Sequence, residues 1–358
     1  MPGRPVVIAG GGTGGHLYPG LALADALAGR GIAVTFVGTA GGLEARVVPT
    51  TRYPLHLLPG RQVRGGGVGR AALGAAALVG AVAGARRLLA TLRPGLVVGV
   101  GGYASVAAVV AARLGRLPTM LLEQNVIPGA ANRWLGRIAA RVCVGFAESS
   151  RWFPSGRAVH TGNPIRGDLV RRRTPRADGR TGVLVFGGSG GAHRVNEAAL
   201  GAFEALGTQA ARLAITHQTG RADADAVRTA YARLGLAARV DAFIDDMGGA
   251  YADADVAIAR AGATSCAELT AVGLPAILVP YPFAADDHQR LNAEVLVRAG
   301  AAEMILDRDC TGARLASVLG PLLADGARLA TMAARARALG RPEAAERVAD
   351  VCVEVCAA

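Results

Sequence analysis

Two stretches of the chain repeat one pattern, in which an apolar run leads into a glycine turn and ends at a histidine. They read VVIAGGGTGGH at residues 6–16 and VLVFGGSGGAH at residues 183–193, so they start 177 residues apart in a chain of 358. Short apolar runs that end in glycine are typical of parallel strands buried on both faces. Because each stretch opens a series of alternating strands and helices, the repeat predicts two similar α/β domains.

The expected strands alternate with helices in the same way in both halves. They cover residues 6–10, 33–38, 96–102, 119–124 and 141–145, then 183–188, 213–219, 239–244, 256–262 and 276–282. Residues 160–182 form the expected linker, which gives domains at 1–162 and 163–341, and a last helix at 342–358 is expected to pack back on the first domain. Parallel sheets bind ligands at the carboxyl ends of their strands, so we expect two Rossmann-like domains around a central cleft.

The first glycine turn suits a bound phosphate. Apolar residues recur at helical spacing over residues 17–28, with Pro19 in the expected first turn. A strand-to-helix glycine turn offers N–H groups and the positive end of a helix dipole to an anion. Gly10, Gly12 and Gly15 also satisfy the dinucleotide fingerprint. That fingerprint needs an acid at the end of the next strand, and the first acid after it is Glu44, which disfavours a nicotinamide dinucleotide.

The excess of positive over negative charge is confined to the first half of the chain. Up to Gly162 there are 17 arginines against 4 acidic residues, and after it 22 against 23, with no lysine anywhere. A basic half implies an anionic partner, such as a phosphorylated substrate, acidic lipid or nucleic acid. Aromatic residues make up only 4% of the chain and do not alternate with the arginines, so we expect no nucleic acid.

Part of this basic half is apolar. Residues 71–85 carry no charge, and arginines flank them within residues 61–94. The uncharged run is shorter than the ~20 residues of a membrane-spanning helix. Two interpretations stay open: a helix that contacts a membrane surface, and an Ala-rich helix packed inside the domain. The N-terminus lacks the pattern of a signal peptide, and the five cysteines form no C-x-x-C pair, which favours reduced core thiols in the cytoplasm.

Eight motifs in order make the chain resemble the MurG family of bacterial N-acetylglucosaminyltransferases. They are GGTGGH, GGYAS, LLEQN, GNPIR, GGSGGA, FIDDM, ARAGATSCAELTAVGLPAILVPYP and DHQRLNA. The resemblance extends from Val6 to about Asn292. The resemblance implies the GT-B architecture that the repeat predicts independently. Gly190 and Ala104 depart from it, since many members have glutamine and proline at these places. The departures affect one phosphate loop and one acceptor loop.

The resemblance also implies an activity and a location. The expected enzyme is an inverting transferase that moves N-acetylglucosamine from UDP-N-acetylglucosamine to the muramyl 4-hydroxyl of undecaprenyl-diphosphate-linked muramyl-pentapeptide. It would be peripheral, at the cytoplasmic face of the plasma membrane, and would serve peptidoglycan synthesis and thereby cell shape and division. Expected partners are the lipid-linked substrate, an anionic membrane surface and a cell-wall synthesis complex, with no cofactor required. A UDP-N-acetylglucosamine 2-epimerase and a glycolipid synthase of the same fold stay open as alternatives.

The resemblance assigns the sugar nucleotide mainly to the second domain. Glu268 is expected to accept hydrogen bonds from the ribose hydroxyls, Ser189 to donate to the diphosphate, and Arg166 to neutralise the phosphates or fix the uridine. Ile244 would read the uracil through its backbone, and Gln289 would contact a sugar hydroxyl. The whole expected donor set is Thr13, Gly14, Gly15, Asn125, Arg166, Ser189, Ile244, Ala263, Thr264, Ser265, Glu268 and Gln289.

His16 is the favoured catalytic base, because an imidazole titrates near neutral pH and a helix N-terminus keeps it neutral. A second role stays open, in which His16 shapes the glycine loop by hydrogen bonding to its backbone. Glu123 is the next candidate base, and His16, Tyr103 and Asn125 are expected to contact the acceptor. The D-x-D triplet at residues 253–255 precedes a strand, away from the glycine loops, so no metal ligand is expected.

Overall fold

The computed structural model describes residues 4–59, 68–171, 176, 178–188 and 190–357. The chain divides into two compact units. The first comprises Met1–Arg166 and Glu343–Ala358, and the second comprises Gly167–Pro342. The first unit therefore continues through Arg166, past the boundary at Gly162 that the sequence suggests.

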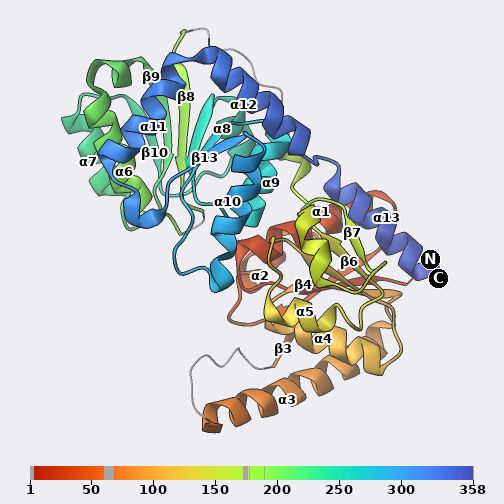
Figure 1. Ribbon diagram of the computed structural model, residues 1–358. Helices are drawn as coiled ribbons and strands as arrows, with labels where there is room; N and C mark the ends of the chain where they lie inside the picture. Colours follow the sequence, from red (N-terminus) through yellow and green to blue (C-terminus); the bar gives the residue numbers. More distant parts are fainter. Residues whose placement is uncertain (1–3, 60–67, 172–175, 177, 189, 358) are drawn as a thin grey trace. The chain divides into compact units, whose positions relative to one another are not determined.

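The first unit is built on a parallel sheet that has seven strands in the described residues, in the order β3-β2-β1-β4-β5-β6-β7 (Figure 1). The strands are β1 (Val6–Gly10), β2 (Val34–Thr39), β3 (Leu55–Leu58), β4 (Leu96–Gly101), β5 (Thr119–Glu123), β6 (Arg141–Val144) and β7 (Ala158–His160). The helices are α1 (Gly14–Gly29), α2 (Glu44–Val47), α3 (Val68–Leu92), α4 (Tyr103–Leu114), α5 (Ala130–Leu135) and α13 (Ala344–Ala357).

Successive side chains of β1 enter different cores, because side chains alternate between the faces of a sheet. Val6 and Ile8 pack with α1 and α13, whereas Val7 and Ala9 pack with α3 and α4. Burial on both faces accounts for the continuous apolar run in the sequence.

The second unit repeats this plan with a parallel sheet of six described strands, in the order β10-β9-β8-β11-β12-β13. The strands are β8 (Thr181–Phe186), β9 (Leu213–Gln218), β10 (Ala238–Asp241), β11 (Val256–Ala259), β12 (Ala276–Leu278) and β13 (Ala302–Met304). The helices are α6 (His193–Leu206), α7 (Ala224–Arg233), α8 (Met247–Ala252), α9 (Ala263–Val272), α10 (His288–Arg298), α11 (Gly312–Ala324) and α12 (Gly326–Leu339). The predicted pair of Rossmann-like parallel-sheet domains is confirmed.

Three strands were not expected from the sequence: β3, β7 and β13. All three lie at the edge of their sheet and have three or four residues each. An edge strand pairs on one side only, and these three are mostly half-buried. They therefore lack the continuous apolar run by which the central strands are recognised.

The C-terminal helix α13 packs against α1 within the first unit (Figure 1). Val348, Val351 and Cys352 are buried in the same core as the side chains of α1. At its edge, Arg30 forms ion pairs of 2.7 Å with both Glu346 and Asp350. The last helix is thus a structural part of the first unit, although the whole second unit separates the two in sequence.

Helix α1 begins at Gly14, three residues before the start expected from its apolar pattern. Pro19 therefore lies inside the helix instead of in its first turn, which corrects the sequence prediction. The apolar pattern missed this first turn because its residues, Gly14, Gly15 and His16, are not apolar. His16 consequently belongs to the helix N-terminus itself.

Helix α3 bears on the two interpretations of the apolar segment. Residues 74–92 are long and apolar enough to cross a membrane by length and composition, and only 17% of that window is buried. This differs from the sequence expectation, because the helix continues past Ala85 through Arg86 and Arg87. One face of the helix still packs in the core beside α4, through Ala81, Ala85 and Leu89. The helix is therefore packed on one face and exposed on the other.

All five cysteines are free thiols, and four of them are buried. Burial raises the pKa of the Cys143 thiol, and likewise that of Cys266, to about 12. Thiols with such pKa values are poor nucleophiles at neutral pH. These cysteines therefore contribute to packing.

Candidate active site

In each sheet, the winding direction reverses between two neighbouring strands, β1 and β4 in the first and β8 and β11 in the second. Open parallel sheets bind ligands beside such a point, at the carboxyl ends of the strands. The loops there include residues 11–13 and 102 in the first unit, and residues 187, 188, 190–192 and 260–262 in the second. Both glycine motifs thus lie where this fold binds its ligands.

His16 lies half-buried in the first turn of α1. Its Nδ1 is 3.2 Å from the carbonyl oxygen of Gly11. A carbonyl oxygen can only accept, so Nδ1 donates and Nε2 carries the lone pair of the neutral ring. A Cβ at Gly101, where φ is +111°, would lie 2.7 Å from Nε2, so only glycine leaves room for the ring. This geometry is compatible with both expected roles, support of the loop through Nδ1 and base catalysis through Nε2.

The side chain of Glu44 is buried beneath the first glycine loop. Its Oε2 accepts from the N–H of Gly12 at 2.6 Å, and its Oε1 accepts from the N–H of Thr39 at 2.8 Å and from the Thr39 hydroxyl at 3.1 Å. The acid that follows β2 therefore contacts the protein's own backbone and is not presented to a ribose. From its place in the sequence Glu44 was interpreted only as a misplaced fingerprint acid, and this contact was not predicted.

Thr13, Gly14 and Gly15 surround the start of α1. Thr13 is its N-cap, with an extended backbone, and its carbonyl oxygen accepts from the N–H groups of His16 and Leu17. The N–H groups of the first helical residues are the ones that a helix offers to an anion. Because the N–H of Gly12 is already donated to Glu44, an anion here would depend on the helix residues.

Glu123 and Asn125 form the turn after β5. Glu123 is 3% exposed, its Oε1 accepts from the Asn125 N–H at 2.9 Å, and its Oε2 accepts from Asn132 Nδ2 at 2.9 Å. Burial raises the pKa of Glu123, against hydrogen bonds that lower it. These contacts fit a carboxylate that holds the turn together. Glu123 would have to leave them to act as a base.

Two further residues of the expected site lie in the first unit. The Tyr103 hydroxyl is buried and has no hydrogen-bond partner among the described residues, and burial raises its pKa. The guanidinium of Arg166 lies 5.6 Å from the centre of the Tyr18 ring on α1. Arg166 was expected with the sugar-nucleotide domain, and the structure groups it with the first unit.

In the second unit, helices α6 and α9 begin directly after the loops that follow β8 and β11. These two strands are neighbours, so two helix N-termini meet at one edge of the sheet. Their N–H groups suit a diphosphate. Ala263, Thr264 and Ser265 form the first turn of α9. Ser189, the expected donor to the diphosphate, lies outside the described residues.

Glu268 lies on α9 and is half-buried. Its Oε2 accepts a hydrogen bond of 2.7 Å from the hydroxyl of Tyr251, which is 1% exposed. Tyr251 thereby fixes the orientation of the carboxylate expected to bind the ribose. Tyr251 was not predicted as part of the site, because it lies on another helix, α8.

Gln218 connects the second glycine loop to the expected uracil site. Its Nε2 donates to the carbonyl of Gly188 at 2.8 Å, and its Oε1 accepts from the N–H of Ile244 at 3.2 Å. The backbone N–H of Ile244 is therefore already used, so a base bound there would contact the carbonyl or displace Gln218. The sequence analysis missed Gln218.

Helix α10 carries Gln289 and Asn292 near the carboxyl edge of the second sheet. Gln289 Oε1 accepts from the N–H of Tyr281 at 3.0 Å. Asn292 is fully buried, and its Nδ2 donates to the carbonyl of Ala261 at 3.2 Å, in the loop after β11. Asn292 thus holds α10 against that loop, and Gln289 lies one turn earlier on the helix.

A series of hydrogen-bonded polar groups extends from the buried His217 on β9 to the exposed His193 at the start of α6. His217 is fully buried, with Nδ1 2.9 Å from the Tyr231 hydroxyl and Nε2 3.0 Å from Asn196 Oδ1. Asn196 Nδ2 donates to Asp223 at 2.7 Å, and Asp223 pairs with His193 at 3.0 Å. Burial lowers the pKa of His217 to about 4. His217 is therefore neutral in the folded protein at neutral pH.

In the part of the chain that the structure describes, no group of three or more His, Cys, Asp or Glu side chains is placed to hold a metal ion. Of the D-x-D triplet, Asp253 follows the end of α8, and Asp255 accepts from the N–H of Gly182 at 2.7 Å. Both positions fit roles in the backbone turns beside β8 and β11.

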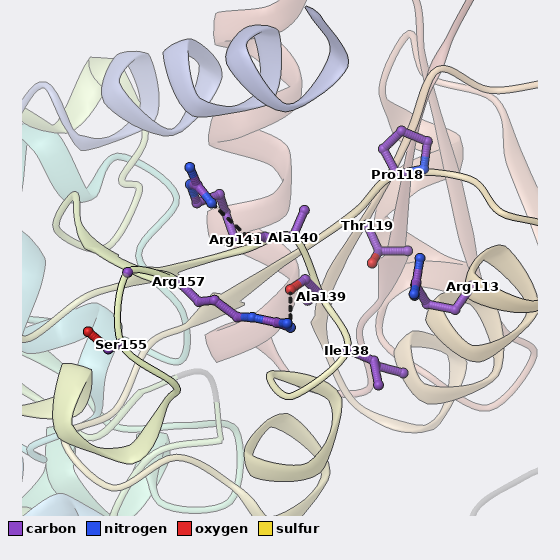
Figure 2. Close-up of a pocket in the computed structure, with 10 residues that line it drawn as sticks. Arg113, Pro118, Thr119, Ile138, Ala139, Ala140, Arg141, Ser155 and Arg157 are labelled. Atoms are coloured by element: carbon purple, nitrogen blue, oxygen red, sulfur yellow. Dashed lines mark hydrogen bonds between the residues drawn. The ribbon is translucent and has the colours of Figure 1, made fainter. Parts of the chain in front are cut away.

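A cavity of about 470 Å³ lies in the first unit, away from these loops (Figure 2). Its lining includes Arg113, Arg141 and Arg157, and none of the three forms an ion pair within the described ranges. The hydroxyl of Thr119, also in the lining, is buried without a hydrogen-bond partner there. The cavity lies at the amino ends of β5, β6 and β7, whereas His16 lies at the carboxyl edge of this sheet. It is a basic surface feature, separate from the candidate active site.

Two Rossmann-like units with glycine loops at the carboxyl edges of their sheets are compatible with a two-domain glycosyltransferase, and comparison with known families shows that class. The model of the glycosyltransferase family 28 N-terminal domain matches residues 6–144. The model of the family 28 C-terminal domain matches residues 182–348.

Individual relatives are similar over nearly the whole chain. Two matching proteins come from Geobacter metallireducens and Myxococcus xanthus. Both are named UDP-N-acetylglucosamine–N-acetylmuramyl-(pentapeptide) pyrophosphoryl-undecaprenol N-acetylglucosamine transferase. The first is 44% identical, over 96% of this chain and 97% of the relative. The second is 46% identical, over 98% of this chain and 92% of the relative.

Solved structures show the same similarity. Acinetobacter baumannii MurG superposes with a TM-score of 0.81 at 32% identity, over 98% of this chain and 99% of that one. A UDP-N-acetylglucosamine 2-epimerase of Listeria monocytogenes gives a TM-score of 0.69 at 16% identity, over 96% of this chain and 95% of that one, which shows the shared fold alone. The chain belongs to the MurG family, within glycosyltransferase family 28. The epimerase alternative has no support beyond the fold.

Proposed function

We propose that this enzyme transfers N-acetylglucosamine from UDP-N-acetylglucosamine to the muramyl 4-hydroxyl of a lipid-linked muramyl-pentapeptide, in peptidoglycan synthesis. The observation that carries the proposal is the identity of 44–46% to transferases named for this reaction, over at least 96% of the chain. The two helix N-termini of the second unit suit the donor diphosphate. The basic first unit suits an acceptor that carries a diphosphate.

The proposed chemistry is a single displacement that inverts the anomeric carbon. The acceptor oxygen bonds to that carbon as the bond to the β-phosphate oxygen breaks, and UDP leaves. His16 Nε2 takes the proton of the acceptor hydroxyl. The N-termini of α6 and α9, with Ser189 and Arg166, stabilise the negative charge on the leaving UDP. No step requires a metal ion.

The direct test is sugar transfer by the purified full-length protein. Labelled UDP-N-acetylglucosamine is incubated with a short-chain analogue of the lipid-linked muramyl-pentapeptide, and the disaccharide product is measured. A parallel reaction without acceptor is analysed for the 2-epimer of the donor. Product only in the presence of acceptor supports the proposal, whereas epimer without acceptor would contradict it.

We expect Glu268→Ala to weaken binding of UDP-N-acetylglucosamine by about 1–3 kcal/mol, because the ribose hydroxyls lose an ionised acceptor. Calorimetric titration of the donor measures the change. Tyr251→Phe is the matched control, since it removes the hydrogen bond that orients Glu268 and leaves the carboxylate in place. Tyr251→Phe should weaken donor binding less than Glu268→Ala does. Unchanged affinity in Glu268→Ala would remove this residue from the donor site.

We also propose that the first unit binds an anionic membrane surface. Two features support this: the exposed apolar face of α3, where Val79 is 70% exposed, and the arginines of the cavity in Figure 2. Because one face of α3 packs in the core, the helix suits contact with a membrane from outside. Apolar contact combined with arginines near lipid phosphates is typical of peripheral binding.

The double change Arg113→Ala and Arg141→Ala should weaken binding to anionic vesicles by about 1 kcal/mol per arginine. The measurement is co-sedimentation of the full-length protein with vesicles of anionic or zwitterionic lipid, at low and high salt. Binding to anionic vesicles should fall with salt. The matched control is Arg212→Ala with Arg233→Ala, two exposed arginines of the second unit. An equal loss in both double variants would contradict a specific role of the first unit.

A further inference from the structure

A single peptide group lies between the ring of His16 and the carboxylate of Glu44. The carbonyl oxygen of Gly11 accepts from His16 Nδ1 at 3.2 Å. The N–H of Gly12 donates to Glu44 Oε2 at 2.6 Å. The Gly11 carbonyl and the Gly12 N–H belong to the same planar peptide bond. Histidine, peptide and carboxylate therefore form one continuous hydrogen-bonded series.

The Glu44 end of this series is arranged to hold a negative charge. Three donors face its two oxygens: the Gly12 N–H, the Thr39 N–H and the Thr39 hydroxyl. An ionised carboxyl group is acceptor-only, and three donors on its two oxygens match that chemistry.

Packing alone does not account for this glutamate. It is 1% exposed, and no arginine or histidine of the described chain pairs with it. Burying a charge without a cation is costly unless hydrogen bonds compensate for lost water. An apolar side chain of similar size would fill the space without that cost. The presence of a charged side chain at this buried position, instead of an apolar one, therefore requires an explanation.

The backbone around the carboxylate is shaped to admit it. A Cβ at Gly11, Gly38 or Gly42 would collide with the Glu44 side chain. Gly11 has a φ of +139°, a conformation that side-chain-bearing residues rarely adopt. The loop conformation that presents the Gly11 carbonyl to His16 is thus the same one that makes room for Glu44.

We propose that Glu44 is a positioning residue for His16 and acts through the peptide bond between Gly11 and Gly12. The inference rests on the proposed function, in which His16 takes the proton of the acceptor. A carboxylate at the N–H end polarises the peptide and makes its carbonyl a stronger acceptor. The proton on Nδ1 stays there throughout, which leaves the lone pair on Nε2 for the proton of the acceptor. When Nε2 takes the acceptor proton, the same polarised peptide stabilises the imidazolium.

Removal of the charge should weaken the base without affecting the donor. Glu44→Gln should lower kcat by about 10–100-fold, by analogy with the loss found when the outer hydrogen-bond partner of a metal-binding histidine is removed. The KM for UDP-N-acetylglucosamine should not change. The acid limb of the kcat/KM profile should move to lower pH, because the imidazolium loses its stabilisation and His16 becomes a weaker base.

A second measurement determines the tautomer and the pKa of His16 directly, without substrate. In protein labelled with ¹⁵N in the histidine rings, NMR gives the tautomer and the pKa of each ring, and His16→Gln identifies the signals of His16. In the wild type, the neutral ring of His16 should carry its proton on Nδ1. Glu44→Gln should lower the pKa of His16. If Glu44→Gln does not fold, Glu44→Asp, which keeps the charge but withdraws it by one methylene, should show a smaller shift in the same direction.

Tyr53→Phe serves as the matched control, because it removes a partly buried hydrogen bond to Asp25 in the same unit and leaves the series intact. It should change neither kcat nor the pKa of His16. A Glu44→Gln enzyme that loses activity while the tautomer and pKa of His16 stay unchanged would overturn the proposal and leave Glu44 as loop support. Absence of sugar transfer by the wild type would reject the proposed function, while the NMR result would still decide the role of Glu44.

Discussion

Replacement of His16 by alanine is expected to lower kcat by roughly 10²–10⁴, or about 2.7–5.5 kcal/mol of activation free energy. The reason is geometric: Nδ1 is engaged by the Gly11 carbonyl, so Nε2 is the basic nitrogen at the carboxyl edge of the sheet. Affinity for UDP-N-acetylglucosamine should change little, because the base acts on the acceptor. The measurements are kcat, acceptor KM and donor affinity for His16→Ala and His16→Gln.

The glutamine variant separates the two roles of His16. Glutamine can still donate a hydrogen bond to the loop, but it cannot take a proton at neutral pH. A large loss of kcat in both variants with normal acceptor KM indicates the base. A fall in acceptor binding along with turnover in His16→Ala, restored in His16→Gln, indicates loop support. Near-normal kcat in His16→Gln would mean that another group is the base, and Glu123 would be examined next.

The second unit is expected to lose about 3 kcal/mol of stability between pH 6.5 and pH 4 through His217 alone. The folded state lowers the pKa of His217 from 6.5 to about 4, because burial opposes the charged ring. In that pH range the unfolded chain binds a proton that the folded chain does not bind, so stability falls as pH falls. Above pH 6.5 the contribution is fully present, and below pH 4 both states are protonated and the dependence ends.

Urea unfolding measured from pH 7.5 to pH 4 tests this, with His217→Gln as the comparison. The variant should show a flatter decline of the unfolding free energy toward low pH, whatever its stability at neutral pH. Circular dichroism follows both units. Both tryptophans, Trp134 and Trp152, lie in the first unit, so their fluorescence gives an internal control. Equal pH slopes in wild type and variant would contradict the assignment to His217.

Much of the fold could be predicted because its signals are local. Continuous apolar runs identified the central strands of both sheets, since those strands are buried on both faces. The edge strands β3, β7 and β13 escaped, since they are short and only partly covered. The start of α1 was placed too late because its first turn is Gly-Gly-His and lacks apolar residues.

The candidate site could be predicted only in part. Residues inside a recognisable motif were found, among them His16 in the first glycine turn and Glu268 on α9. Their partners were not, because Tyr251 and Gln218 approach from other elements of the second unit. The roles assigned to the donor and acceptor residues stay predictions until the variants above are measured.

By itself, the sequence determined the two parallel-sheet domains, the glycine turns at their carboxyl edges and the family, because each depends on patterns within a few neighbouring residues. Only the tertiary structure decided which distant groups meet. Glu44 is 32 residues from Gly12, and Arg30 is 316 residues from Glu346. Hydrogen bonds and ion pairs act over a few ångströms, and the spacing of residues along a chain does not fix such distances. The surroundings of His16 therefore became visible only once the sheet had brought β1, β2 and β4 side by side.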